Sequence, residues 1–178
     1  MTDKIIISLF DYSGTWSLPY RLAGYRVLQI DSKLGVNIYD FNFKSLPRTI
    51  VHGILTAPPC TDFSKAGANL WVAKDLNGTT KKSLKLIYRT FDIIDYFNPT
   101  WWVLEQPPGR LETLIPSLKN SRLMSFHPYQ FGDPYKKYTI LYGRFNPFFV
   151  QFPVTPIFKT AHGQMSIDNY QIHHQKKT

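Results

Sequence analysis

Apolar and polar positions divide this chain into short apolar runs and one long helical pattern. Runs of apolar residues that end at turn residues are typical of buried β-strands. We expect such strands at residues 4–10, 26–31, 51–59 and 100–108. Residues 79–97 instead repeat apolar side chains at helical spacing after a threonine cap, which predicts a helix.

Three weaker patterns complete the expected layout. Residues 17–25 fit a short helix that ends near Gly24, residues 35–41 a short third strand, and residues 136–145 a further strand. Strands that alternate with helices favour an α/β fold, Rossmann-like, with a mostly parallel twisted sheet and helices on both faces. We expect one domain over residues 1–178, with a flexible tail at 165–178.

The composition of the chain indicates where the protein works and what kind of partner it binds. The chain is 178 residues long, 43% hydrophobic and 19% charged, as globular proteins are, and its longest apolar runs are too short to span a membrane. A single cysteine cannot form an internal disulfide, which suits a reducing cytoplasm. The net charge of +9 favours a polyanionic partner, with nucleic acid first. The histidines show no metal-ligand spacing, so we expect no metal.

Acids and one thiol follow the predicted strands, where α/β sheets bind their ligands. Asp11, Asp31, Asp40 and Glu105 each end or follow an apolar segment, and Cys60 follows two prolines. A small-residue turn followed by an acid about twenty residues later is typical of a nucleoside site. The turn "DYSGTWS" holds one glycine where a pyrophosphate-binding loop needs three, so a nucleoside without phosphates fits better.

Six segments resemble, in order, the motifs of the cytosine-5 DNA methyltransferases, and most closely those of short phage versions. They are "SLFDYSGTWSLPYRLAGY", "QID", "IYDF", "APPCTDFS", "VLEQPPGRL" and "QFGDPYKKYTILYG". The resemblance runs from residue 5 to about residue 145. It implies S-adenosylmethionine as cofactor and DNA, duplex or single-stranded, as partner, in a bacterial or phage-infected cytoplasm.

The resemblance also implies a role for each matching residue. The cofactor would contact Phe10, Asp11, Ser13, Gly14, Thr15, Trp16, Asp31, Asp40 and Pro58. Cys60 would add to carbon 6 of a flipped-out cytosine, while Glu105 would hold ring nitrogen 3 and the exocyclic amine, so that carbon 5 can be methylated. The two prolines fix backbone φ angles and would present the thiol. The DNA would contact Pro59, Ser64, Arg110, Lys136 and Lys137.

The chain departs from the family pattern at three places. Tyr12 stands where the first motif usually has glycine, Gln106 where the sixth has asparagine, and "YKKYT" where the eighth has Gln-x-Arg-x-Arg. A tyrosine resists positive φ, which predicts a changed loop or weaker cofactor binding. No target-recognition region is evident after residue 145, which leaves three alternatives open: weak specificity, action on single strands, or a specificity partner or homodimer.

Two other functions stay open. A catalytically impaired homologue would bind DNA or cofactor without turnover, whereas an unrelated Cys-His hydrolase would need a histidine near Cys60. Each residue also has a structural interpretation. A lone cysteine is often a small buried hydrophobe, Glu105 can be an ion-paired acid, Asp31 and Asp40 can cap turns, and the basic residues can be solvated.

Overall fold

The computed structural model describes residues 3–157, and the chain divides into two compact units. The first comprises Met1–Ser125 and Thr139–Phe149, and the second comprises Phe126–Tyr138 and Val150–Thr178. The expected tail at 165–178 lies outside the described residues. The first unit holds every described residue of the predicted site except Lys136 and Lys137, and the single catalytic domain over 1–178 stays a prediction.

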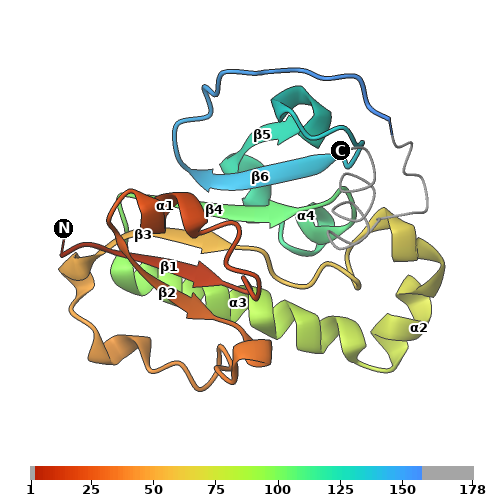
Figure 1. Ribbon diagram of the computed structural model, residues 1–178. Helices are drawn as coiled ribbons and strands as arrows, with labels where there is room; N and C mark the ends of the chain where they lie inside the picture. The colour runs from red at the N-terminus through yellow and green to blue at the C-terminus, as the bar shows by residue number, and fades with distance from the viewer. Residues whose placement is uncertain (1–2, 158–178) are drawn as a thin grey trace. The chain divides into compact units, whose positions relative to one another are not determined.

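The first unit is built on a sheet whose strand order is β2-β1-β3-β4-β6-β5 (Figure 1). Its strands are β1 (Ile5–Leu9), β2 (Arg26–Ile30), β3 (Val51–Thr56), β4 (Trp101–Gln106), β5 (Arg122–Phe126) and β6 (Thr139–Arg144). The first four strands are mutually parallel, and β6 runs antiparallel to β4. The sheet is therefore mostly parallel, as predicted, and the strand expected over 136–145 forms its antiparallel part.

The strand register fixes which residues share the carboxyl edge of this sheet. Leu9 lies opposite both Ile30 and Thr56, and Thr56 lies opposite Leu104. The next residue along each strand therefore belongs to one row across that edge: Phe10, Asp31, Ala57 and Glu105. Acids that are far apart in the sequence are thus brought to the same edge, the place where such sheets bind ligands.

Helices cover both faces of the sheet (Figure 1). Helix α3 (Thr79–Phe97) packs Ile93 and Ile94 on one face, in a core that includes Ile7 of β1. Helix α1 (Leu18–Leu22) lies on the other face, where Tyr20 packs near Val103. The short helices α2 (Trp71–Leu76) and α4 (Leu111–Leu114) follow β3 and β4. The predicted α/β class is confirmed. Short 3-10 turns occupy Ser32–Leu34, Phe43–Ser45, Arg48–Ile50, Lys65–Leu70, Pro116–Ser121 and Pro128–Phe131.

The segment 35–41 was predicted as a strand and is a turn. Asn37 decides this locally, because its side-chain oxygen accepts from the backbone N–H of Tyr39 at 3.0 Å and its carbonyl accepts from Asp40 and Phe41. Such side-chain bonds compete with strand pairing. The expected threonine cap of α3 is also wrong, since Gly78 holds the N-cap in a left-handed conformation.

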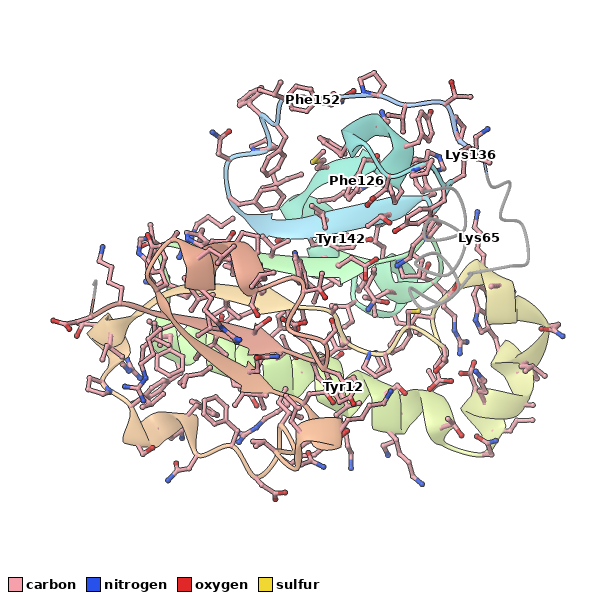
Figure 2. All side chains as sticks on the ribbon, viewed as in Figure 1. Tyr12, Lys65, Phe126, Lys136, Tyr142 and Phe152 are labelled. Carbon is pink, nitrogen blue, oxygen red and sulfur yellow. The ribbon has the colours of Figure 1, made fainter. Side chains whose placement is uncertain are left out.

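The second unit is described over 126–138 and 150–157. Its two segments join where Phe152 and Val154 donate their backbone N–H groups to the carbonyls of Gln130 and Tyr129, at 3.0 and 2.8 Å. Phe126 packs edge-on against Phe131, and Figure 2 labels Phe126 and Phe152. None of the described helices of either unit is long and apolar enough to cross a membrane.

Candidate active site

The loop after β1 is held in shape by the carboxylate of Asp11. This buried side chain accepts hydrogen bonds from the hydroxyls of Ser8 and Ser17, at 2.9 and 2.7 Å, and from the backbone N–H of Ser17 at 3.2 Å. All three bonds reach Oδ2. Burial is tolerated because the carboxylate is multiply hydrogen-bonded. Asp11 thus shapes the loop, and its predicted cofactor contact stays a prediction.

The loop has left-handed backbone conformations at Phe10 and Gly14, and none at Tyr12. Phe10 and Gly14 adopt φ of 60° and 70°, while Tyr12 is not among the residues with positive φ. A Cβ at Gly14 would lie 2.9 Å from Nε2 of Gln29, which itself donates to the carbonyl of Asp11 at 2.8 Å. Tyr12 therefore replaces a glycine without backbone strain. Tyr12 is 56% exposed as a residue and lies beyond the end of β1 (Figure 2).

The other predicted residues of this loop differ in exposure. Ser13 and Thr15 are exposed, and the hydroxyl of Ser13 accepts from the backbone N–H of Thr15 at 3.3 Å. Trp16 is half-buried and packs against the core cluster on the α1 face of the sheet. Ser13 and Thr15 thus present groups to solvent at the loop, while Trp16 packs against the core, and its predicted cofactor contact stays a prediction.

The two acids predicted for the nucleoside lie in different settings. Asp31 directly follows β2, is half-buried, and caps a 3-10 turn by accepting from the backbone N–H of Lys33 at 2.8 Å. Asp40 is exposed and lies in the turn that replaces the expected strand. The carbonyls of that turn accept from the guanidinium of Arg89 on α3 at 3.3–3.4 Å. Asp31 belongs to the row at the carboxyl edge, whereas Asp40 ends no strand.

Cys60 lies on a compact loop directly after β3. Pro58 is buried and Pro59 exposed, and the carbonyl of Cys60 accepts from the backbone N–H groups of Phe63 and Ser64 at 2.9 and 2.8 Å. The thiol-bearing residue itself is half-buried. Ser64 then accepts from Ala66 N–H at 3.2 Å and caps the 3-10 turn that follows. The hydroxyl of Ser64, predicted to contact DNA, has this capping role.

Gln106 ties the end of β4 to the Cys60 loop. Its side chain is 1% exposed, and Nε2 donates to the carbonyl of Pro58 at 2.7 Å. This contact links the residue after Glu105 with the residue two before Cys60. Gln106, which stands where the family usually has asparagine, therefore has a structural function in this chain, because its amide joins the end of β4 to the loop after β3.

A short antiparallel bridge continues this tie. The carbonyl of Phe63 accepts from Arg110 N–H at 2.8 Å, and Pro108 accepts from Lys65 N–H at 3.0 Å. Between them a Cβ at Gly109 would lie 1.8 Å from the carbonyl oxygen of Phe63, so only glycine fits this close approach. The loops that carry Cys60 and follow Glu105 are consequently bonded to each other along their length.

Arg110 joins these loops to the helices and was predicted to contact DNA. Its Nε donates to the carbonyl of Asp62 at 3.0 Å, and its terminal nitrogens form a two-pronged pair with Asp75 at 2.7 and 2.8 Å. It also donates to Thr80 at 2.8 Å and lies over the ring of Trp71. Only 11% of the side chain is exposed. The donors of Arg110 are thus engaged by groups of the protein itself. Its predicted contact with a DNA phosphate stays a prediction, and the geometry does not support it.

The buried Asp62 fixes the loop to α2 and α3. Its carboxylate pairs with Lys74 Nζ at 2.7 Å and accepts a short hydrogen bond from the hydroxyl of Ser83. Burial alone would raise the pKa of Asp62, but the bonds from Lys74 and Ser83 outweigh it and lower the pKa. The carboxylate is therefore ionised at neutral pH and anchors the segment two residues after Cys60.

The residues of the eighth motif are divided between the two units. Lys136 and Lys137 belong to the second unit, whereas residues 139–145 belong to the first. Arg144 is the first arginine after "YKKYT" and so a possible substitute for an arginine of the family's Gln-x-Arg-x-Arg. It lies opposite Trp102 in the sheet and donates to the carbonyl of Pro99 and to Asn98. It is thus at the amino-terminal edge of β4, the edge away from Glu105, and cannot take that arginine's place.

A hollow of about 710 Å³ also lies at the amino-terminal edge, lined by residues that include Arg48, Asp95, Asn98 and Arg144. The hollow is remote from the row that includes Asp31 and Glu105. We place the candidate site at the carboxyl edge and not in this hollow, because sheets of this kind bind ligands at the carboxyl ends of their strands. Among the described residues no cluster of histidine, cysteine or acidic side chains could hold a metal ion.

Sequence reasoning missed the residues that hold the site together. Gln29, Asp62, Lys74 and Arg89 had no predicted role, yet each binds one of the loops. The one available signal was the polar residue inside an apolar strand, Gln29 in "RVLQI", because a buried polar group needs a partner. The bonds of the other three residues follow no local pattern.

Comparison with known proteins gives the family. The profile of the C-5 cytosine-specific DNA methylases matches residues 6–111, from β1 to the start of α4. A similar solved structure, described as a DNA modification methyltransferase encoded within a prophage (E. coli), shares 15% identity at a TM-score of 0.48. That match covers 79% of this chain but 46% of the other, so the chain spans less than half its length. No curated protein sequence matches. By the extent of the profile match, the chain belongs to the C-5 cytosine-specific DNA methylase family.

Proposed function

We propose that this protein methylates carbon 5 of cytosine in DNA, with S-adenosylmethionine as the methyl donor and Cys60 as the nucleophile. The observation that carries the proposal is the bonded pair of loops after β3 and β4, which join the Cys60 segment to the Glu105 segment. The acid at the end of β2, Asp31, belongs to the same row. A nucleophile, an acid for the base and an acid for a nucleoside thus share one edge.

The chemistry divides between the two loops. The Cys60 thiolate adds to carbon 6 of the extruded cytosine, which raises the electron density on carbon 5 so that it can attack a methyl group. When bound, S-adenosylmethionine would supply that methyl group and leave as S-adenosylhomocysteine. A proton then leaves carbon 5, and the sulfur leaves carbon 6 with its electron pair. Glu105 holds ring nitrogen 3 and the exocyclic amine, so that the ring stays oriented through both steps.

The first loop supports the cofactor assignment. Gly14 has left-handed φ and packs against Gln29, so the backbone can approach a ligand closely there. The half-buried carboxylate of Asp31 is a suitable acceptor for ribose hydroxyls. With one glycine in the loop, the donor set suits a nucleoside without a pyrophosphate.

A second candidate is a homologue that binds DNA or cofactor without turnover. It is favoured by the position of Arg144 at the opposite edge, which leaves the first unit without a described arginine for the eighth motif. A Cys-His hydrolase has less support. The sole histidine among the described residues of the first unit, His52, contacts Thr100 and stacks on Tyr25 near the start of β3.

Nucleoside mass spectrometry tests the proposal. Purified protein is incubated with S-adenosylmethionine and duplex or single-stranded DNA, and 5-methylcytosine is measured after digestion. We expect Cys60→Ala to abolish the signal, while the neighbouring exposed Thr61→Ala retains it. Undiminished methylation by Cys60→Ala would refute the mechanism.

Cofactor binding separates the alternatives. Calorimetric titration with S-adenosylmethionine should give wild-type affinity for Cys60→Ala within a few-fold and a clear loss for Asp31→Ala. The exposed Asp92→Ala on α3, which has no proposed role at the site, should retain wild-type affinity. Binding without any 5-methylcytosine would favour the impaired homologue. Absence of both would refute the family's chemistry for this chain.

A further inference from the structure

The amino-terminal half of α3 carries an unbalanced positive charge. Lys81, Lys82 and Lys85 are exposed in its first two turns, and the first turn contains no acid. The acids of the helix, Asp92 and Asp95, come in its last two turns. Within residues 3–157 none of the three lysines lies within ion-pair distance of a carboxylate. We call these three residues the α3 lysine face.

The nearby acids are already neutralised by other cations. Asp62 pairs with Lys74 at 2.7 Å, and Asp75 pairs with Arg110 at 2.7 Å. The charge of the α3 lysine face is therefore not compensated by its surroundings. An external anion can approach it without displacing an internal partner.

This arrangement opposes the preferences of an isolated helix. Cations are favoured at a helix C-terminus and acids at the N-terminus, and the charges of α3 are placed the other way round. Lys81 and Lys85 are also like charges at the i, i+4 spacing, which repel each other. Folding stability does not explain these lysines, whereas binding of a polyanion does.

The α3 lysine face lies at the same edge of the sheet as the proposed site. Helix α3 begins at the side toward which β1 to β4 point (Figure 1). The link is direct, because Ser83, between the lysines, bonds to Asp62, and Asp62 follows Cys60 by two residues. A duplex or strand that presents a base to Cys60 must continue beyond the site, and its phosphates can then reach this part of α3.

We infer that the α3 lysine face binds the phosphate backbone of DNA that flanks the target cytosine. This inference rests on the proposed function, since it takes the same substrate at the same edge. The contact is electrostatic and independent of base sequence. It accounts for part of the net charge of +9 with named residues.

The test is the salt dependence of DNA binding by the full chain. Affinity for an unmethylated duplex of mixed sequence is measured by fluorescence anisotropy over a range of salt concentrations. The variant Lys81→Gln with Lys85→Gln is compared with Arg26→Gln with Lys44→Gln. Arg26 opens β2 and Lys44 lies beside Tyr96 near the end of α3, so both exposed residues mark the opposite edge.

Affinity falls with salt, so the slope of log affinity against log salt is negative. We expect the Lys81, Lys85 double variant to make this slope shallower by about two, since each lost phosphate contact removes roughly 0.9. The control pair should leave the slope unchanged while removing the same charge. Equal slopes for wild type and the α3 variant would overturn the inference, as would equal losses in both double variants, which would indicate general charge attraction. These outcomes are independent of turnover, because 5-methylcytosine formation tests the proposed function separately.

Discussion

Substitution of Arg110 is the sharpest test of how the site is held together. The sequence predicts that Arg110 contacts DNA, whereas in the structure it bonds to other residues of the protein. Replacement by methionine keeps an unbranched side chain about as long as the aliphatic stem of arginine and removes the guanidinium with all its donors. The carbonyl of Asp62 and the hydroxyl of Thr80, which is 5% exposed as a residue, lose their hydrogen bonds. The guanidinium also leaves the face of Trp71, which lies 4.8 Å from it.

The expected cost follows from these contacts. Two lost hydrogen bonds to poorly exposed groups cost about 1 kcal/mol each. The cation–π contact adds about 0.5 kcal/mol. The ion pair with the exposed Asp75 is left out, because surface pairs contribute little. We therefore expect Arg110→Met to lower the free energy of unfolding by about 2–3 kcal/mol.

Urea unfolding followed by circular dichroism measures this change, with the exposed Arg26→Met as a control that should change stability by less than about 0.5 kcal/mol. Arg110→Lys keeps the charge but loses the planar fork, so it should also be destabilised. The reasoning is refuted if Arg110→Met unfolds like wild type and its salt slope for DNA falls by about one, since Arg110 would then be a phosphate contact.

Two further expectations concern the loops. Gln106→Leu leaves the carbonyl of Pro58 without its donor and should lower the free energy of unfolding by about 1–3 kcal/mol, measured in urea. An unchanged unfolding midpoint would mean that this tie does not hold the loop. The pKa of Asp62 is lowered from its ordinary value of 3.8 by Lys74 and Ser83 despite burial, so its ionised form stabilises the fold above that pH and the stabilisation is lost as pH falls below it. Unfolding measured between about pH 5 and pH 3 should therefore show a shallower pH dependence for Asp62→Asn than for wild type, and equal slopes would contradict the assignment.

The local elements of the first unit could be read from the sequence. The pattern over 79–97 gave α3 with its observed bounds, Thr79–Phe97, and the apolar runs gave β1 to β4 within three residues at either end. Each of these elements has a strong apolar pattern, and the apolar residues of that pattern are the ones that it buries in the core. The strand predicted over 35–41 was wrong. The conformation of this short segment is set by a side-chain hydrogen bond of Asn37 and by the contact with Arg89.

The family was also determined by the sequence, because its motifs are local strings of residues. The match over residues 6–111 agrees with the motifs read in order along the chain. The roles of Cys60, Glu105 and Asp31 in that chemistry remain predictions, for which the experiments above are designed.

Tertiary structure alone decided how the site is held. Which loops face each other depends on strand order and register, and the bonds from Gln106 to Pro58 and from Arg110 to Asp62 each join residues 48 apart in the sequence. The direction of β6, which sends Arg144 to the far edge, has no local signal either. Sequence patterns report which face of an element is buried, because burial acts on each residue separately. Polar partners are set by geometry between distant segments, and only the folded chain brings those segments together.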